Sequence, residues 1–270
     1  MNGAAHRPQR GFTLLELLMA MAVFVLICAA MFGLLQLSQQ KYSSESQLSG
    51  TFQEARLAMD QIVRDVNDAG YPPLSFFSGL PADPAQYAFN PFAWWPGYSP
   101  TSPVDCQIGT GGGGTCVTPS DFDLIVETTV GSAPGTGVSW IRYQLAGNTL
   151  MRGVVTKSAL DPISATNAAG VMVPFLSNVM NQPSAAQLAQ IQAAYPAMFA
   201  SGQAVPIFQY MCDSPSGPVA CPLAGLNNSP TEIRDVDITL IVATPQRDTA
   251  TQRWNIVQLN GRGHRLNPSK

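Results

Sequence analysis

Glu16 is the side chain with the most conspicuous chemistry, because it is the only charged residue in an apolar run from Phe12 to Leu35. A charge at the centre of a membrane-spanning segment costs roughly 2.5–3.5 kcal/mol, and less near the edge. A carboxylate in such a setting is stabilised by a cation that lies close to it. The position of Glu16 therefore predicts a charge pair with a cationic group that lies outside this run.

The apolar run itself predicts a membrane-spanning helix. Its 24 residues would extend about 36 Å as an α-helix, whereas a hydrocarbon core is about 30 Å thick. Residues 1–11 carry Arg7 and Arg10 and no acid, so the positive-inside rule keeps them in the cytoplasm. We therefore expect a single pass, with the C-terminal part on the far side of the membrane.

The sequence Arg10-Gly11-Phe12-Thr13-Leu14-Leu15-Glu16 resembles the class III leader of type IV pilins and type II secretion pseudopilins. The resemblance implies that a prepilin peptidase cleaves after Gly11 and that Phe12 is then N-methylated. It also implies that Glu16 helps subunits to add to a helical fibre, by pairing with the N-terminal amine of a neighbouring subunit.

The same resemblance implies a location and a set of partners. The location is the bacterial inner membrane with the C-terminal head in the periplasm, and afterwards a pilus or pseudopilus fibre. The partners are other pilins or pseudopilins, the prepilin peptidase and methyltransferase, the inner-membrane assembly platform, and the membrane before assembly.

Two other interpretations of the N-terminus are less satisfactory. A secretory signal peptide fits poorly, because the run exceeds the 7–15 residues of a typical apolar region and no small-x-small cleavage site follows it. A plain signal anchor accommodates the length, but it leaves Glu16 without a role.

Composition indicates an exported protein that does not bind nucleic acid electrostatically. Charged residues make up 11% of the chain. Removal of residues 1–11 takes away two of the 14 basic residues and leaves 12 against 17 acidic ones. The mature chain would therefore lack the basic surface that nucleic acid requires.

Four of the five cysteines form two close pairs, Cys106 with Cys116 and Cys212 with Cys221. In an exported domain this spacing predicts two local disulfides, although four cysteines allow three connectivities. Zinc ligation is disfavoured because the pairs lack the short gaps of zinc ligands. Cys28 lies in the apolar run and is interpreted as a small apolar residue.

An apolar stripe at alternating steps of four and three predicts that the helix continues to about Ala69. The stripe consists of Leu48, Phe52, Ala55, Met59, Ile62 and Val66. Gly70 and Pro72 then end the helix. We assign residues 1–11 to the leader, 12–35 to the membrane or fibre-core helix, 36–70 to its amphipathic continuation and 71–270 to a globular head.

The head is predicted to be a β-rich domain, which makes the chain an α+β protein with one long helix packed on an antiparallel sheet. Strands are expected to begin at 121 and to lie at 138–145, 149–155, 171–179, 205–212, 232–244 and 253–259, and a short helix at 184–194. Pro174 predicts an edge position for the strand that contains it. Residues after 259 are expected to form a polar tail that includes Arg262 and His264.

Two further segments carry a weaker resemblance. Residues 64–71 resemble the helix end of PilW-type minor pilins, and residues 143–152 resemble a tyrosine-to-arginine hairpin frequent in that group. A capped helix followed by an aromatic residue that packs on the head explains the first segment equally well.

Residues 72–120 form a long loop region with nine prolines and many aromatic residues. A loop of this length is often functional. Trp94 and Trp95 are compatible with an adhesive or glycan-contacting surface, and also with aromatic residues that simply cover the sheet and helix.

The sequence does not predict an enzyme or a cofactor site. His264 is the one histidine left after the leader, which disfavours a Ser/His/Asp triad and a His-rich metal site. Asp121 with Asp123, and Asp235 with Asp237, share strand faces as calcium ligands would. Acids that alternate along a solvated strand explain both pairs more simply.

These observations favour a PilW-type minor pilin over a GspJ-type pseudopilin. The two share leader, helix and head. About 200 residues follow Gly70, and large heads in these families usually belong to minor rather than major subunits. A signal-anchored periplasmic binding protein or enzyme is the remote third alternative.

Overall fold

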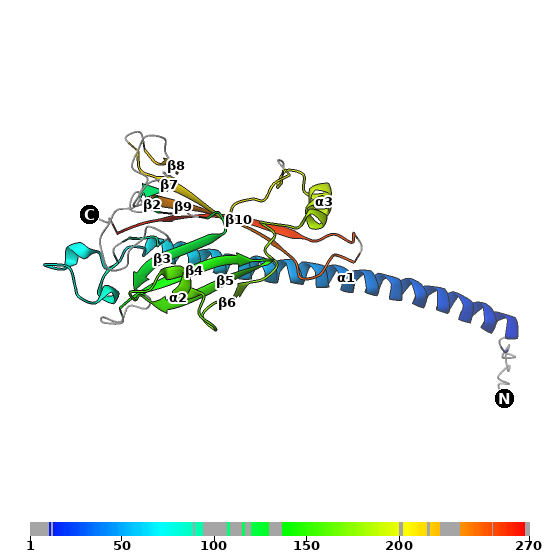
Figure 1. The fold of residues 1–270 in the computed structure, drawn as a ribbon. Helices are drawn as coiled ribbons and strands as arrows, with labels where there is room; N and C mark the ends of the chain where they lie inside the picture. Colours follow the sequence, from blue (N-terminus) through cyan, green and yellow to red (C-terminus); the bar gives the residue numbers. More distant parts are fainter. Residues whose placement is uncertain are drawn as a thin grey trace, which may run out of the picture. The chain divides into compact units, whose positions relative to one another are not determined.

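The structure is a computed structural model in which the chain forms two compact units, Met1–Gln47 and Leu48–Lys270. One helix, α1 (Leu14–Asn67), contributes residues to both units and is drawn in blue in Figure 1. The described residues are 11, 13–88, 90–93, 107–108, 115–116, 120–129, 137–199, 202–214, 217–221, 233–249 and 251–267.

The first unit is the N-terminal part of α1. Its large apolar side chains are exposed, as illustrated by Leu14 at 79%, Leu26 at 70% and Phe32 at 67%. The helix is long and apolar enough to cross a membrane. An apolar surface of this extent is stable in lipid or against other helices, and not in water.

In the second unit α1 buries one face against the head. Ala55, Met59, Ile62 and Val66 are at most 6% exposed, as the predicted stripe requires. Phe52 departs from the prediction because it is 42% exposed. Its neighbour Thr51 is buried instead, and successive helical residues point about 100° apart, so the face that meets the head excludes Phe52.

The head contains two four-stranded antiparallel sheets, with strand orders β3-β4-β5-β6 and β10-β9-β7-β8, and a two-stranded parallel pair, β1-β2. The strands are β1 (Gln107–Ile108), β2 (Thr115–Cys116), β3 (Asp123–Thr129), β4 (Val138–Ala146), β5 (Thr149–Thr156), β6 (Val173–Leu176), β7 (Phe208–Cys212), β8 (Val219–Ala220), β9 (Ile233–Ala243) and β10 (Ile256–His264). The short helices are η1 (Leu74–Phe76), η2 (Pro84–Gln86), α2 (Pro162–Thr166) and α3 (Ala185–Ala194). The predicted α+β class, one long helix packed on antiparallel sheets, is confirmed.

The main core joins α1 to both large sheets. It includes Ile62 and Val66 from α1, Val126 and Ile141 from the first sheet, and Val236 and Leu240 from the second. The other face of β9 contributes Ile241 and Ala243 to a separate cluster, which α3 covers with Ile191. Burial on both faces explains why the end of β9, from Leu240 to Ala243, is continuously apolar.

Several local predictions are confirmed. β4 and β5 form a hairpin in which Gly147 has a φ of 61°, a conformation that glycine adopts at little cost. β6 lies at the sheet edge, where Pro174 removes no hydrogen bond from an inner strand. Ser184 caps α3 through a reciprocal pair of hydrogen bonds with Gln187.

The predicted polar tail is wrong, because β10 continues to His264 and pairs with β9 along its whole length. Gly261 and Gly263 explain the error. A Cβ on Gly261 would lie 2.5 Å from Met59 Sδ, and one on Gly263 would lie 2.5 Å from Val66 Cγ1. The strand face that meets α1 must therefore lack side chains, so it carries no apolar signal in the sequence.

Candidate functional site

The N-terminal site begins at Gly11, which is exposed, while α1 starts three residues later at Leu14. Residues 1–10 and Phe12 lie outside the described residues. Cleavage after Gly11 and methylation of Phe12 therefore stay predictions. The described Thr13 and Glu16 give the geometry of the site.

Thr13 and Glu16 form a reciprocal cap at the start of α1. The backbone N–H and the hydroxyl of Thr13 donate to Glu16 Oε2 at 2.9 and 3.0 Å, and the Glu16 N–H donates to Thr13 Oγ1 at 3.3 Å. Such a cap satisfies backbone N–H groups that a helix leaves without an internal partner. The carboxylate is thereby held at the mouth of the apolar segment.

Among the described residues, Glu16 has hydrogen-bond donors but no cationic partner. Both of its bonds come from Thr13, and within the described residues no basic side chain lies within 4 Å of its carboxylate. Hydrogen bonds from one neutral residue do not cancel a negative charge. The geometry therefore leaves Glu16 able to accept a cation from another molecule.

A second carboxylate of α1, Asp65, is neutralised within the chain. Tyr143 Oη donates to Asp65 Oδ2 at 2.5 Å, and Arg152 Nη2 donates to the same oxygen at 3.0 Å. Arg152 Nε donates to Tyr143 Oη at 2.9 Å. Gln61 donates to the other oxygen, Asp65 Oδ1, at 2.8 Å. Helix and hairpin are thus joined by one hydrogen-bonded network.

This network changes the protonation behaviour of the tyrosine. Burial, followed by the nearby Asp65 charge, raises the pKa of Tyr143 far above its ordinary value. The phenol must be neutral here, because only its protonated hydroxyl can donate a hydrogen bond to the carboxylate. The two segments singled out by resemblance, 64–71 and 143–152, therefore meet through Asp65, Tyr143 and Arg152.

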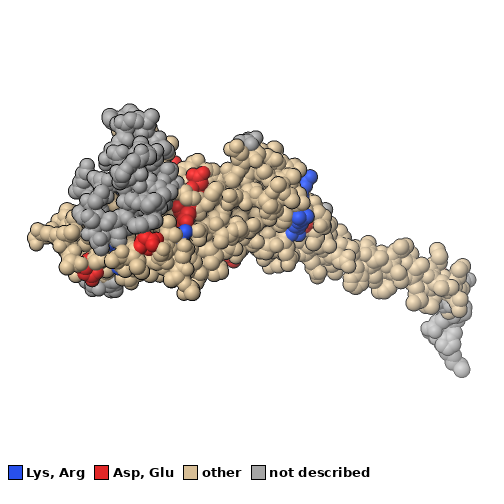
Figure 2. Space-filling view, viewed as in Figure 1, with Lys and Arg blue, Asp and Glu red and all other residues tan. Residues whose placement is uncertain are grey.

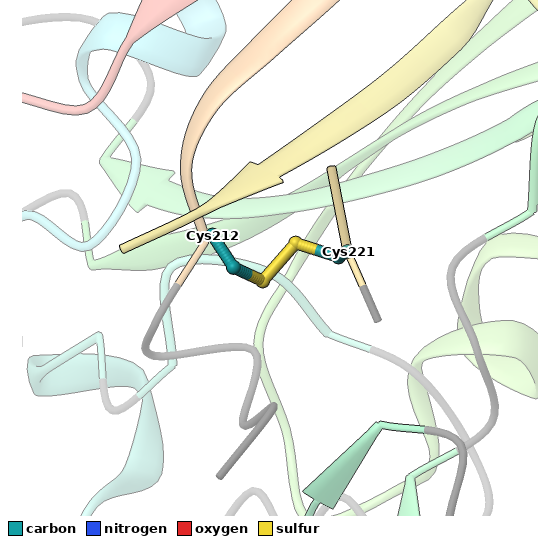
Figure 3. The surroundings of a disulfide bond; sticks show 2 residues. All are labelled: Cys212 and Cys221. Carbon is teal, nitrogen blue, oxygen red and sulfur yellow. A yellow bond between two sulfur atoms is a disulfide. The ribbon is translucent and has the colours of Figure 1, made fainter. Parts of the chain in front are cut away.

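One of the two predicted disulfides is present. Cys212 and Cys221 are bonded, with their Cα atoms 5.4 Å apart (Figure 3). The link connects β7 to the residue that follows β8 and closes the edge of the second sheet. Cys106 lies outside the described residues, as does the side chain of Cys116, so that pairing stays a prediction. Cys28 is a free, partly buried cysteine of the apolar helix.

Two of the four carboxylates considered as metal ligands are engaged by arginines, and a third is in contact with a histidine. Arg142 donates to both oxygens of Asp123, at 2.9 and 2.6 Å. Arg262 does the same for Asp237, and His264 Nδ1 lies 2.6 Å from Asp235 Oδ1. Within the part of the chain that the structure describes, no three His, Cys, Asp or Glu side chains are grouped to hold a metal ion.

Sequence reasoning missed a fully buried ion pair. Lys157 Nζ lies 2.5 Å from Glu127 Oε1, donates to the Tyr87 carbonyl at 2.9 Å and stands 4.5 Å from the centre of the Tyr87 ring. Glu127 directly follows three apolar residues of β3, and this was the available signal. Its partner Lys157 lies 30 residues away in sequence, so no local pattern indicated the pairing itself.

Trp94 and Trp95, for which the sequence left open a contact surface or a cover for the sheet and helix, lie outside the described residues. On the face of the molecule shown in Figure 2, charged side chains are few and neutral residues dominate the described surface. This agrees with the 11% charged content of the chain.

Comparison with known proteins bears on the N-terminal site alone. Residues 6–32 match the family model described as the prokaryotic N-terminal methylation motif. No curated protein and no solved structure matches the chain. The match contains Gly11, Phe12 and Glu16, and it supports a type IV pilin-like protein, anchored in the membrane, with a prepilin-type leader.

Proposed function

We propose that the protein is a minor pilin of the PilW type, which primes or caps a type IV pilus. The observation that carries the proposal is the methylation-motif match around a capped Glu16, which no basic side chain of the described residues engages. The large head supports a minor rather than a major subunit, because a bulky head packs poorly along a fibre. The role is structural and not enzymatic.

The proposed processing follows from the leader. A prepilin peptidase cleaves after Gly11 while the leader is cytoplasmic and the head is periplasmic. The new N-terminus at Phe12 is methylated and stays cationic. The mature protein waits in the inner membrane until the assembly platform transfers it to the fibre.

The proposed assembly step pairs charges in an apolar setting. Glu16 accepts the N-terminal amine of an adjoining subunit, which offsets the cost of a carboxylate in lipid. The exposed apolar side chains of α1 supply the contact area. The charge pair sets the axial position of one subunit against the next.

The test is Glu16→Ala, with Glu45→Ala as its matched control on the same helix. Loss of one partner of a desolvated charge pair costs about 2–5 kcal/mol, so we expect incorporation into fibres to fall at least about tenfold. Incorporation is measured by immunoblot of sheared fibres against total protein. Cleavage after Gly11 should persist in both variants.

If the Glu16→Ala protein entered fibres at the wild-type level, the assembly mechanism would be contradicted. A mature N-terminus at Met1 in a host with active processing machinery would contradict the function. Mass spectrometry of the mature chain should instead find methylated Phe12, and a bulky substitution of Gly11 should block cleavage.

A GspJ-type pseudopilin is the second candidate, since it has the same leader and helix. Co-purification of the full-length protein from its own host discriminates between the two. Pilus subunits among the partners support the minor pilin, and secretion-system components support the pseudopilin. A signal-anchored binding protein or enzyme would retain its leader residues and enter neither fibre.

A further inference from the structure

A groove of about 290 Å³ lies in the head between the C-terminal half of α3 and the loop that joins β9 to β10. Its wall on the loop side includes Arg247, Arg253 and Trp254, and α3 contributes Gln190 and Tyr195. The groove lies wholly within the second compact unit, whereas the N-terminal site belongs to the first.

The loop is held in one conformation by its own hydrogen bonds. The Asp248 N–H donates to the Arg253 carbonyl, and the Gln252 N–H donates to the Asp248 carbonyl, both at 2.8 Å. The Asp248 carboxylate accepts from the N–H and hydroxyl of Thr251 at 2.7 and 3.0 Å. Tyr195 Oη donates to the Trp254 carbonyl at 3.2 Å. The groove is therefore preformed.

Arg247 is ordered by contacts with two neutral side chains. Its Cζ lies 4.1 Å from the centre of the Trp254 ring, and its Nη2 donates to Gln190 Oε1 at 2.8 Å. The side chain is nevertheless exposed. A guanidinium held flat in this way has already lost its rotamer entropy and still offers unused donors to a planar anion.

The charge of the groove is unusual for this head. The strand arginines Arg142, Arg152 and Arg262 each bind a carboxylate. In the described part of the chain no carboxylate lies within salt-bridge distance of Arg247 or Arg253, and the described lining contains no Asp or Glu. Two arginines without acids, one of them preordered, favour an anionic ligand.

The remaining lining narrows the class of anion. Gln190, Thr251 and Gln252 offer amide and hydroxyl groups that suit neutral hydroxyls. Arg247 covers the Trp254 ring, which also packs against the buried cluster under α3, so stacking of a nucleobase is disfavoured. A volume near 300 Å³ suits a small ligand rather than a protein surface.

We propose that this groove binds a carboxylate-bearing sugar residue of an acidic polysaccharide. The carboxylate is bound by the Arg247 guanidinium and assisted by Arg253, and the ring hydroxyls are bound by the neutral polar side chains. This site is independent of the proposed fibre function.

The test is calorimetric titration of the full-length protein in detergent with trigalacturonate at low ionic strength. Maltotriose serves as a neutral probe of similar size, and phosphate and a short single-stranded DNA serve as other anions. The variants are Arg247→Gln and Arg253→Gln. The control is Arg56→Gln, which removes an exposed arginine from α1.

We expect trigalacturonate to bind and maltotriose not to bind. Arg247→Gln should weaken binding about tenfold or more, since charged hydrogen bonds are the strongest in the site. Arg253→Gln should weaken binding a few-fold, and Arg56→Gln should leave binding unchanged. Equal binding of maltotriose, full displacement by equimolar phosphate, tighter binding of the DNA, or an unaffected Arg247→Gln protein would each overturn the proposal.

Discussion

The two ends of α1 each carry a carboxylate near apolar residues, and the two are stabilised in opposite ways. Asp65 is 7% exposed and receives hydrogen bonds from Tyr143, Arg152 and Gln61 within the chain. Glu16 is exposed, and within the described part of the chain Thr13 is the residue that donates to its carboxylate. One carboxylate completes a fold, and the other is left for a partner.

The apolar residues around the two carboxylates follow the same division. Residues 14–47 expose their large apolar side chains, whereas the second part of α1 buries Ala55, Met59, Ile62 and Val66 in the head. Changes in the second part should therefore alter folding stability. Changes in the first part should alter assembly and leave the stability of the head intact.

The largest effect on stability is expected from Asp65→Asn. The variant leaves Arg152 partly buried opposite a neutral amide, so the free energy of unfolding should fall by about 3 kcal/mol. Urea unfolding of the full-length protein in detergent, followed by tryptophan fluorescence, measures the change. Asp60→Asn, exposed on the same helix, should cost less than about 0.5 kcal/mol. An equal loss in the free energy of unfolding for Asp65→Asn and Asp60→Asn would contradict the role of Asp65 in the fold.

The disulfide should contribute slightly less. Cys212 and Cys221 are nine residues apart in sequence, and a closed loop of this length is worth about 2.7 kcal/mol on the chain-entropy model. We expect the Cys212→Ser/Cys221→Ser protein to unfold at lower urea concentration by that amount. Fibre incorporation per folded molecule should not change. Unaltered stability after reduction of the wild-type protein would contradict the prediction.

Alkaline pH should lower the free energy of unfolding through Tyr143, which contacts the second part of α1, and the effect should be smaller than that of the disulfide. Because burial and Asp65 raise the pKa of Tyr143 in the folded state, its contribution is fully present below the unfolded pKa of about 10. Above that pH the unfolded chain ionises first. The free energy of unfolding should then fall by up to about 1.4 kcal/mol per pH unit for this residue.

Tyr143→Phe should reduce the alkaline slope without abolishing it, since burial also raises the pKa of Tyr210. Tyr42→Phe, at an exposed position of the first part of α1, should leave the slope unchanged. Urea unfolding between pH 9 and about 11 gives the slopes. Identical slopes for wild type and Tyr143→Phe would disprove the role of the network.

The smallest effect is expected from Thr13→Ala. Loss of an N-cap costs a helix about 1 kcal/mol, and only in its first turn. Hydrogen exchange of the amides of residues 14–17 in detergent should quicken several-fold. Urea unfolding of the head should be unaffected, and a destabilised head would show that the two parts of α1 are coupled.

Much of the fold was predictable because its signals are local. The β4–β5 hairpin follows from Gly147 and its flanking alternation, and the helix end follows from Gly70 and Pro72. The N-terminal site was predictable for the same reason, since Gly11, Phe12 and Glu16 lie within six residues. Two predictions were wrong, namely the burial of Phe52 and a polar tail in place of the end of β10. Both depend on which surface the partner element presents.

The amino-acid sequence by itself determined the leader, the long helix and the α+β class, and it favoured the local Cys212–Cys221 link, because each depends on residues close together in the chain. Tertiary structure alone decided that Asp65 meets Tyr143 and Arg152, which are 78 and 87 residues away, and that Lys157 neutralises Glu127. It also brought α3 beside the β9–β10 loop to make the arginine-lined groove. The physical reason is that charges and hydrogen bonds act at short range in space, and the packing of the apolar core selects which distant residues come within that range.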